Sequence, residues 1–298
     1  PDSLIYSLTD SNLVSDHEIR LSGLANNSRY FYALSDGVSI LQGDSSNYFT
    51  TAPSHGTSKP TRIWVMGDTG VNTVDQNTVR DAFLNYNGNQ NVDLLLMLGD
   101  NAYNSGTDQE YQNAFFQNHY EDILKNTPLL TIAGNHENYT ANALNQTGPY
   151  YDIFNLPKNG ECGGVPSGTE AYYSFDYGQI HIIGLEVNTP SLLLPGSTML
   201  TWLANDLSAT TQKWRIVMLH NSPYTKGGHD SDTENDLIQI RQQIMPILDQ
   251  YKVDLVLCGH NHVYERSYLM EGHYGNSASL TPSMIVDSTY GTLPQAYI

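Results

Sequence analysis

From Thr61 onward, short apolar runs that predict strands alternate with longer stretches that predict helices. The first three predicted strands are "TRIWVMG", "VDLLLMLG" and "PLLTIAG". Between them lie the predicted helices "VDQNTVRDAFLNY" and "QEYQNAFFQNHYEDILK". Alternation of this kind is typical of layered α/β folds, in which helices cover the faces of a sheet. No other feature limits the possible folds of the chain as strongly.

The second half of the chain continues the alternation and adds a hairpin. The stretch "AYYSFDYGQIHIIGLEV" predicts two antiparallel strands. After it come the predicted helix "TMLTWLANDL", the strand "KWRIVMLH", the helix "DTENDLIQIRQQIMPILDQY" and the strand "VDLVLCG". A hairpin combined with strands that are separated by helices predicts a mixed sheet.

Residues 1–53 follow a different pattern. "HEIRLSGLANNSRYFYALSDG" alternates apolar and polar residues on both sides of Asn26-Asn27, and "SNYFTTA" predicts a further strand. Gly-Leu, a polar turn and Tyr-x-Tyr resemble the tyrosine corner of fibronectin type III β-sandwiches. So few strands cannot complete a sandwich, so we expect residues 1–53 to be its C-terminal part. Residues 54–60 then form a linker, and residues 61–298 a larger domain that is incomplete at its C-terminus.

Charge and hydropathy exclude several classes of partner. The 298-residue chain has a net charge of −18, which argues against nucleic acid and anionic membrane surfaces. No apolar run approaches the length of a membrane span, so we expect no membrane insertion. The many Asn, Ser, Thr and Gly residues are typical of a secreted protein, extracellular or periplasmic, and further domains of a larger extracellular chain would fit this setting.

The two cysteines are too few for a disulfide framework. Cys162 lies in a glycine-rich loop, and Cys258 ends the apolar strand "VDLVLC". We expect Cys258 to be a free buried thiol that packs as a small hydrophobic residue. A bridge between Cys162 and Cys258 is the alternative.

Five predicted strands end on residues that can bind a metal ion. Strand ends of α/β sheets meet at one edge, where such sheets carry their sites. A glycine before most of these residues lets the backbone turn sharply and approach an ion. The motifs are GDTG, GDNAY, GNHE, VMLH and GHNH, with candidate ligands Asp68, Asp100, Tyr103, Asn135, His136, His220, His260 and His262.

Each motif alone has an ordinary structural explanation as a capping aspartate or a satisfied core histidine. All five, in order and at strand ends, should arise by chance less than about once in a million sequences. Oxygen and nitrogen ligands without a thiolate suit iron, zinc or manganese. Even without His136, the other seven groups are too many for one catalytic ion, and they suit two ions about 3.5–4 Å apart that share a carboxylate.

The ordered motifs resemble the five-motif signature of purple acid phosphatases, a branch of the calcineurin-like metallophosphoesterase superfamily. The resemblance covers roughly residues 61–290 and includes "HVYERS" after the last motif. It implies a four-layer α/β/β/α sandwich with mixed sheets. The N-terminal remnant is similar to the β-sandwich that precedes the catalytic domain in the larger members.

The resemblance also implies a role for each motif residue. Asp100 would bridge a ferric ion and a divalent ion of iron, zinc or manganese. The phenolate of Tyr103 would stabilise Fe(III) over Fe(II), and most other branches of the superfamily lack a tyrosine there. The ferric ligands would be Asp68, Tyr103 and His262, and the divalent ligands Asn135, His220 and His260.

Two further histidines resemble the substrate-facing residues of the family. His136 would contact the phosphate and help to protonate the leaving oxygen. His229 matches a second such position, although plant enzymes often carry a His-His pair where this chain has His229-Asp230. Three charged residues are expected to support the ligands, and these are Glu137, Glu265 and Arg266. The histidines off the motifs, expected to be structural or exposed, are His17, His55, His119, His181 and His273.

The predicted function is hydrolysis of phosphate monoesters, an acid phosphatase activity in which a metal-activated hydroxide attacks a small phosphorylated substrate in line. One alternative is a phosphodiesterase or nucleotide pyrophosphatase on the same scaffold, because pocket loops set the substrate class. Another is a phosphatase-like domain that serves as a structural or adhesion module of a larger extracellular protein.

Overall fold

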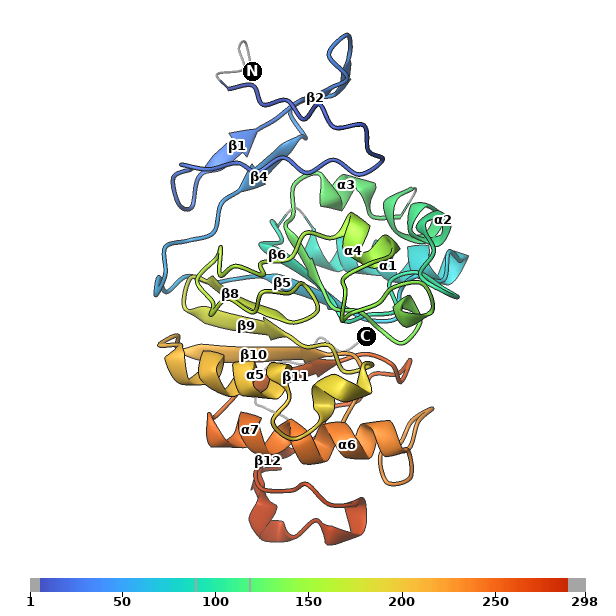
Figure 1. The fold of residues 1–298 in the computed structure, drawn as a ribbon, viewed down its shortest axis with the longest axis vertical. Coiled ribbons are helices and arrows are strands. Elements are labelled where there is room, and N and C mark those ends of the chain that lie inside the picture. Colours follow the sequence, from blue (N-terminus) through green and yellow to red (C-terminus); the bar gives the residue numbers. More distant parts are fainter. Residues whose placement is uncertain (1–5, 89, 118, 289–298) are drawn as a thin grey trace.

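The computed structural model describes residues 6–88, 90–117 and 119–288 (Figure 1). A parallel sheet follows residue 60, in the order β5-β6-β7. Its strands are β5 (Ile63–Met66), β6 (Leu94–Met97) and β7 (Leu129–Thr131). Helix α1 (Val74–Asn87) connects the first two, and Trp64 of β5 stacks on Phe83 of α1 at 3.8 Å between ring centroids. The helix therefore covers the outer face of this sheet.

The second sheet is mixed, in the order β11-β10-β9-β8. Strands β8 and β9 form the predicted antiparallel hairpin, whereas β9, β10 and β11 run parallel. The strands are β8 (Tyr173–Tyr177), β9 (Ile180–Gly184), β10 (Trp214–Leu219) and β11 (Leu255–Cys258). Its helices are α5 (Thr198–Ala209), α6 (Asn235–Gln243) and α7 (Met245–Gln250). The prediction of a mixed sheet is confirmed.

The two sheets lie between two layers of helices, with α5, α6 and α7 on the side away from α1 (Figure 1). One apolar core joins Leu96 of β6 to Phe175 of β8 and Ile182 of β9, so it fills the space between the sheets. A second core joins Val217 of β10 to Leu203 of α5. This arrangement is the predicted four-layer α/β/β/α sandwich.

Two predicted helices are each broken. The stretch 109–125 forms α2 (Asp108–Tyr111), a π-helical turn (Gln112–Phe116) and α3 (Glu121–Leu124), because burial of Tyr111 and Phe115 against Phe154 overrides the local propensity. The stretch 232–251 is divided into α6 and α7 just before Pro246, since proline has no N–H for the helical ladder.

The N-terminal part contains only short strand pairs. β1 (Arg29–Phe31) pairs with β4 (Tyr48–Thr50), and β2 (Leu34–Ser35) with β3 (Ile40–Gln42). The strand expected before Asn26 is wrong, because residues 17–24 pair with no strand and leave Ile19 46% exposed. The Tyr30 hydroxyl accepts a hydrogen bond from the Ala25 backbone N–H at 2.8 Å, as a tyrosine corner requires. The division into a partial β-sandwich, a linker and a larger domain stays a prediction.

The remaining elements are short. They are α4 (Pro149–Ile153), β12 (Leu269–Met270), β13 (Ile285–Asp287) and 3-10 turns at Glu137–Tyr139, Pro190–Leu193, Ser277–Ser279 and Pro282–Met284. Cys162 and Cys258 are free thiols, which excludes the bridge, and Cys258 is only partly buried. Within the described ranges, no helix combines the length and apolar character needed to cross a membrane.

Candidate metal centre

Four predicted ligands have a left-handed backbone, which non-glycine residues rarely adopt. The φ angles are 58° at Asp68, 52° at Asp100, 71° at His260 and 49° at His262. These are half of the eight non-glycine residues with positive φ in the described part of the chain. Such conformations persist only where the surrounding structure holds them, and they cluster at functional sites. The backbone is therefore bent, at a local cost in free energy, to aim these side chains.

The motif glycines allow the ligand loops to approach one another. A Cβ atom on Gly134 would lie 2.1 Å from Oδ1 of Asp100, and one on Gly99 would lie 2.6 Å from Nδ1 of His220. Gly99 also has a φ of 90°. Any side chain at either position would push the loops apart, so these glycines are required by close packing as well as by the turn.

The predicted ferric ligands lie together at the ends of β5, β6 and β11. The Tyr103 hydroxyl is 2.9 Å from Oδ2 of Asp100 and 3.3 Å from Oδ1 of Asp68. It also lies 3.0 Å from Nε2 of His262, which is in turn 3.4 Å from Oδ1 of Asp68. The backbone N–H of His260 donates to both carboxylate oxygens of Asp68, at 3.0 and 2.8 Å, and fixes that carboxylate.

The predicted divalent ligands adjoin this group through Asp100. Oδ1 of Asn135 lies 3.0 Å from Nε2 of His220 and 2.9 Å from Nδ1 of His260. Nε2 of His220 also lies 3.5 Å from Oδ2 of Asp100. The structure thus brings all seven predicted ligands into one cluster, in which each has a neighbour within 3.5 Å.

The donor set fits a cation. Nδ1–H of His220 donates to the Leu98 carbonyl at 2.7 Å, so Nε2 of the neutral ring carries a lone pair. That lone pair meets the oxygens of Asn135 and Asp100, which are acceptors as well. Two acceptors only 3.0 Å apart, as Nε2 of His220 and Oδ1 of Asn135 are, need a proton or a metal ion between them. The residues present can therefore hold an ion at this point.

The pKa values of the cluster residues reflect the same close approach of carboxylates and imidazoles. Burial raises the pKa of Asp68, and the nearby Asp100 carboxylate adds to the rise. Burial also acts to raise the pKa of Asp100, but the hydrogen bond and the charge of His220 outweigh it and lower that pKa to about 2. For His220, burial lowers the pKa, yet the carboxylate of Asp100 raises it to about 9. In the ion-free protein a second proton on His220 thus takes the place that a cation would occupy.

Glu137 holds two ligand loops together from beneath. Its side chain is fully buried, and Oε2 accepts from the backbone N–H groups of Asp100 at 2.9 Å and Gly134 at 2.7 Å. Oε1 accepts from the N–H of Asn101 at 2.8 Å and the hydroxyl of Tyr111 at 3.2 Å. This geometry agrees with the supporting role predicted for Glu137, which itself stays a prediction.

The predicted substrate-facing histidines are both fixed at Nδ1. Nδ1 of His136 lies 2.6 Å from the Asn104 carbonyl, so its proton is donated there and Nε2 faces the cluster, 3.8 Å from Oδ2 of Asp100. Nδ1 of His229 lies 2.8 Å from Oε2 of Glu234. The His229 ring stacks on that of His260, with centroids 4.0 Å apart. Each ring can present Nε2 to a ligand.

Two residues of this region were missed from the sequence. Glu234 is one, and with His229 and His260 it offers ligand atoms that all lie within 4.8 Å of one another. Asn261, inside the GHNH motif, is the other: its Oδ1 accepts from the backbone N–H of His229 at 2.9 Å. The only signal for Asn261 was its place between two predicted ligands, and the sequence gave no reason to single out Glu234.

The other predicted supporting residues follow the last motif. Glu265 accepts from the Lys226 backbone N–H at 3.1 Å and from Nδ2 of Asn261 at 2.5 Å. Arg266 is exposed, and its supporting role stays a prediction. Of the histidines off the motifs, three are buried and two are exposed. The buried ones are His119, His181 and His273, at 7%, 1% and 5% exposure, and the exposed ones are His17 and His55.

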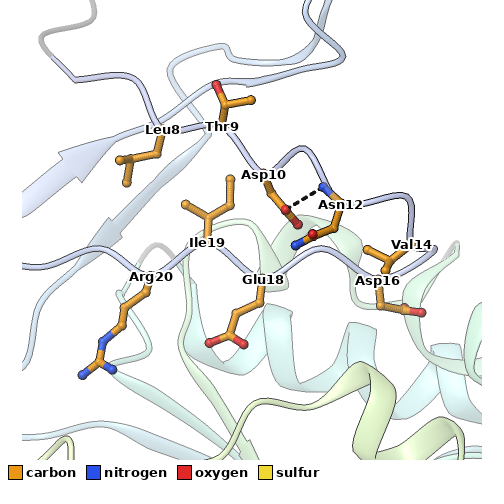
Figure 2. A pocket seen from close by; sticks show the side chains of 9 residues that line it. All are labelled: Leu8, Thr9, Asp10, Asn12, Val14, Asp16, Glu18, Ile19 and Arg20. Carbon is orange, nitrogen blue, oxygen red and sulfur yellow. Dashed lines mark hydrogen bonds between the residues drawn. The ribbon is translucent and has the colours of Figure 1, made fainter.

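A hollow of about 450 Å³ lies elsewhere, along the N-terminal segment between Leu8 and Arg20 (Figure 2). Its lining mixes apolar side chains with carboxylates such as Asp10, whose Oδ1 accepts from the Asn12 backbone N–H at 3.0 Å. None of the predicted site residues lines it. It is a surface feature of the N-terminal segment and has no part in the cluster.

Two sheets between helical layers, with predicted acid, amide, phenol and imidazole ligands at the strand ends, are the arrangement expected of a metallophosphoesterase. Residues 61–264 match the calcineurin-like phosphoesterase family, and the chain belongs to it. Membership implies phosphoester hydrolysis at a divalent metal centre. The expectation drawn from the five motifs is confirmed at this level.

Purple acid phosphatases are among the relatives. Purple acid phosphatase 15 of Arabidopsis thaliana is 27% identical over 277 residues, which cover 84% of this chain and 49% of the relative. Two uncharacterized proteins of Mycobacterium tuberculosis are 30% identical over 184 residues, covering 56% of this chain and 34% of theirs. The chain spans about half or less of the length of these relatives.

A solved structure supports the fold. The purple acid phosphatase from seeds of yellow lupin (Lupinus luteus) superposes with a TM-score of 0.60 at 20% identity. The match covers 85% of this chain and 47% of the lupin protein. The predicted fold class is therefore confirmed.

Proposed function

We propose that this protein hydrolyses phosphate monoesters at a pair of metal ions, as purple acid phosphatases do. One observation carries the proposal: the seven predicted ligands converge, and Tyr103 is among them, with its hydroxyl 2.9 Å from Asp100. The phenol distinguishes a ferric site from the all-divalent sites that carboxylates, amides and imidazoles would serve alone.

A ferric ion would be held by Asp68, Tyr103 and His262, and a divalent ion of iron, zinc or manganese by Asn135, His220 and His260. Asp100 would serve both ions. When bound, they supply charge to clamp the phosphate oxygens and acidify a water molecule. Burial, and then the carboxylates of Asp68 and Asp100, raise the pKa of the Tyr103 phenol far above its ordinary value. The phenol therefore keeps its proton until a strongly charged cation displaces it.

The histidines supply the proton. His136 keeps its Nδ1 proton on the Asn104 carbonyl, so Nε2 is the nitrogen that meets substrate. Protonated there, it would donate to the leaving oxygen of the ester, a step typically worth about 10²- to 10⁴-fold. His229, fixed by Glu234, would act from the side of His260, on whose ring it stacks.

The substrate is a small phosphorylated molecule. The net charge of −18 repels an anionic substrate at long range, so the bound ions must supply the local attraction. Nucleic acid and membrane insertion are not part of the proposal. The Asn-, Ser-, Thr- and Gly-rich composition favours a secreted protein, extracellular or periplasmic.

The test compares kcat/KM for p-nitrophenyl phosphate and bis-p-nitrophenyl phosphate on protein loaded with iron and zinc. We expect the monoester to be the better substrate. A clear preference for the diester would replace the proposal with a phosphodiesterase or nucleotide pyrophosphatase. Absence of bound metal together with absence of activity on both substrates would favour the structural or adhesion module.

A further inference from the structure

We propose that Asn261 is a positioning residue that holds His229 in the site by tying its loop to the metal-binding loop. The inference rests on the proposed function, because it assigns His229 to the leaving group. Asn261 lies between the predicted ligands His260 and His262, yet it is only 5% exposed and its side chain turns away from them toward residues 225–229. A side chain in this place can connect the ions to the proton donor.

Both the oxygen and the nitrogen of the Asn261 side-chain amide form hydrogen bonds. Oδ1 accepts from the backbone N–H of His229 at 2.9 Å. Nδ2 donates to Oε2 of Glu265 at 2.5 Å and also to Oγ1 of Thr225. Thr225 itself donates to Glu265, and it is buried. Both ends of the segment from Thr225 to His229 are thus hydrogen-bonded to one side chain.

Between these two ends the backbone packs directly on the amide. A Cβ atom on Gly227 would lie 2.4 Å from Nδ2 of Asn261 and 2.8 Å from Cγ2 of Val263. One on Gly228 would approach Asn261 only to 3.5 Å, which is ordinary van der Waals contact. Because the Asn261 amide lies directly against position 227, the segment requires glycine there. Position 228 has room for a methyl group.

The imidazole of His229 is fixed by other groups. Oε2 of Glu234 accepts from Nδ1 at 2.8 Å, and the ring stacks on His260. Asn261 fixes the backbone of His229, Glu234 fixes its tautomer, and Nε2 is left for the substrate. Because Asn261 is flanked by two predicted metal ligands, its hydrogen bond to His229 fixes that residue relative to the metal-binding loop.

The main test is Asn261→Ala in metal-loaded protein, assayed with two monoesters. Glycerol phosphate has a poor leaving group and needs the acid, whereas p-nitrophenyl phosphate needs it little. We expect kcat to fall about 10- to 100-fold for glycerol phosphate, since a misplaced catalytic group costs this much, and less than about threefold for p-nitrophenyl phosphate. Metal content should not change. An equal loss on both substrates would overturn the proposal.

A double-mutant cycle tests whether the effect passes through His229. Asn261→Ala should add nothing to the loss on glycerol phosphate already caused by His229→Ala, because both remove the same function. Independent, multiplied losses would mean that Asn261 acts elsewhere.

The two glycines give a matched pair that does not depend on the folding of the Asn261 variant. Gly227→Ala should show the same selective loss as Asn261→Ala, and Gly228→Ala should behave as wild type. Equal behaviour of the two glycine variants would contradict the role given to the amide.

A readout independent of activity separates this inference from the proposed function. In metal-free protein, peptide mapping after treatment with diethyl pyrocarbonate should show faster modification of His229 in Asn261→Ala than in wild type. If metal-loaded wild type hydrolyses neither monoester, the proposed function fails, while faster modification would still support the positioning. An unchanged modification rate means that Asn261 does not hold His229.

Discussion

Two buried histidines lie at opposite ends of neighbouring strands in the same sheet. His181 is near the start of β9, and His220 follows the end of the parallel strand β10. Both are at most 1% exposed, both contact aspartates, and in both the carboxylates raise the pKa to about 9 against the opposing effect of burial. The exposed fraction, the presence of a nearby aspartate and the raised pKa therefore do not distinguish the two histidines.

The hydrogen-bond partners of the individual ring nitrogens distinguish His181 from His220. Nδ1 of His181 lies 2.7 Å from Asp176 and Nε2 lies 2.7 Å from Asp206, so each ring nitrogen has its own carboxylate. The other oxygen of Asp206 accepts from the backbone N–H of Val165 and the hydroxyl of Ser174. This cluster is complete within the chain. His220 has one satisfied nitrogen, and its second faces a surplus of acceptors, so only the His220 cluster calls for an ion.

The largest expected difference concerns activity. Asp100→Asn removes the shared carboxylate of the His220 cluster and should lower kcat/KM for p-nitrophenyl phosphate by about 10³- to 10⁴-fold, because several kcal/mol of charge stabilisation are lost. Asp81→Asn, at an exposed aspartate of α1 that pairs with Arg80, is the matched control and should be neutral. Retention of more than a tenth of wild-type activity by Asp100→Asn would contradict the role of the bridge.

The cluster of His181, Asp176 and Asp206 should contribute to the free energy of unfolding. Asp206→Ala leaves the charge of His181 with a single buried partner and should lower the free energy of unfolding of the metal-free protein by about 3–5 kcal/mol. Urea unfolding measures this, with Asn205→Ala on the exposed face of the same helix as a control within about 0.5 kcal/mol. A loss below about 1 kcal/mol for Asp206→Ala would mean that the cluster is not structural.

The pH dependence follows from the raised pKa of His181. A histidine with a folded pKa of about 9, above its unfolded value near 6.5, binds its proton more tightly when folded. Its contribution is full below about pH 6.5 and is lost as the pH rises to about 9, up to roughly 3 kcal/mol. Urea unfolding of metal-free protein across this range should show the decline. It should be smaller in His181→Gln, and an identical decline there would assign it to other groups.

The smallest expected effect on stability is that of His55, an exposed residue at the edge of the His181 cluster. Nε2 of His55 lies 3.2 Å from Oδ2 of Asp176, but the His55 side chain is 60% exposed. Exposed ion pairs contribute about 0–1 kcal/mol, so His55→Ala should change the free energy of unfolding by less than about 1 kcal/mol. A larger loss would show that the cluster depends on the linker.

Much of the fold and of the ligand set could be predicted from the sequence because both are local patterns. A buried parallel strand is a continuous apolar run, as in Leu94–Met97, and the strand end is marked by a glycine followed by a polar residue. Parallel strands in two stacked sheets then bring Asp68, after β5, and His262, after β11, to the same end of the sandwich. The alignment of five motifs therefore predicted a cluster that local reasoning about any one of them could not.

What the sequence could not predict depends on contacts between loops. Nothing in the pattern around Asn261 or Glu234 indicates that they hold His229, since both contacts arise from the packing of one loop on another. His181 shows no local sign of having two carboxylate partners, which are contributed by β8 and α5. The helix break at Gln112–Phe116 likewise reflects tertiary burial, and the break before Pro246 reflects the proline ring.

If the proposed function is right, the cluster around Asp100 holds two ions at once. The most direct test is the number of metal ions per chain after metal-free protein is reconstituted with iron and zinc, desalted and analysed by mass spectrometry for both elements. We expect two ions per chain in wild type, one of them iron, and fewer than two in Asp100→Asn. One ion or none in correctly folded wild type, or an unchanged count in the variant, would contradict it.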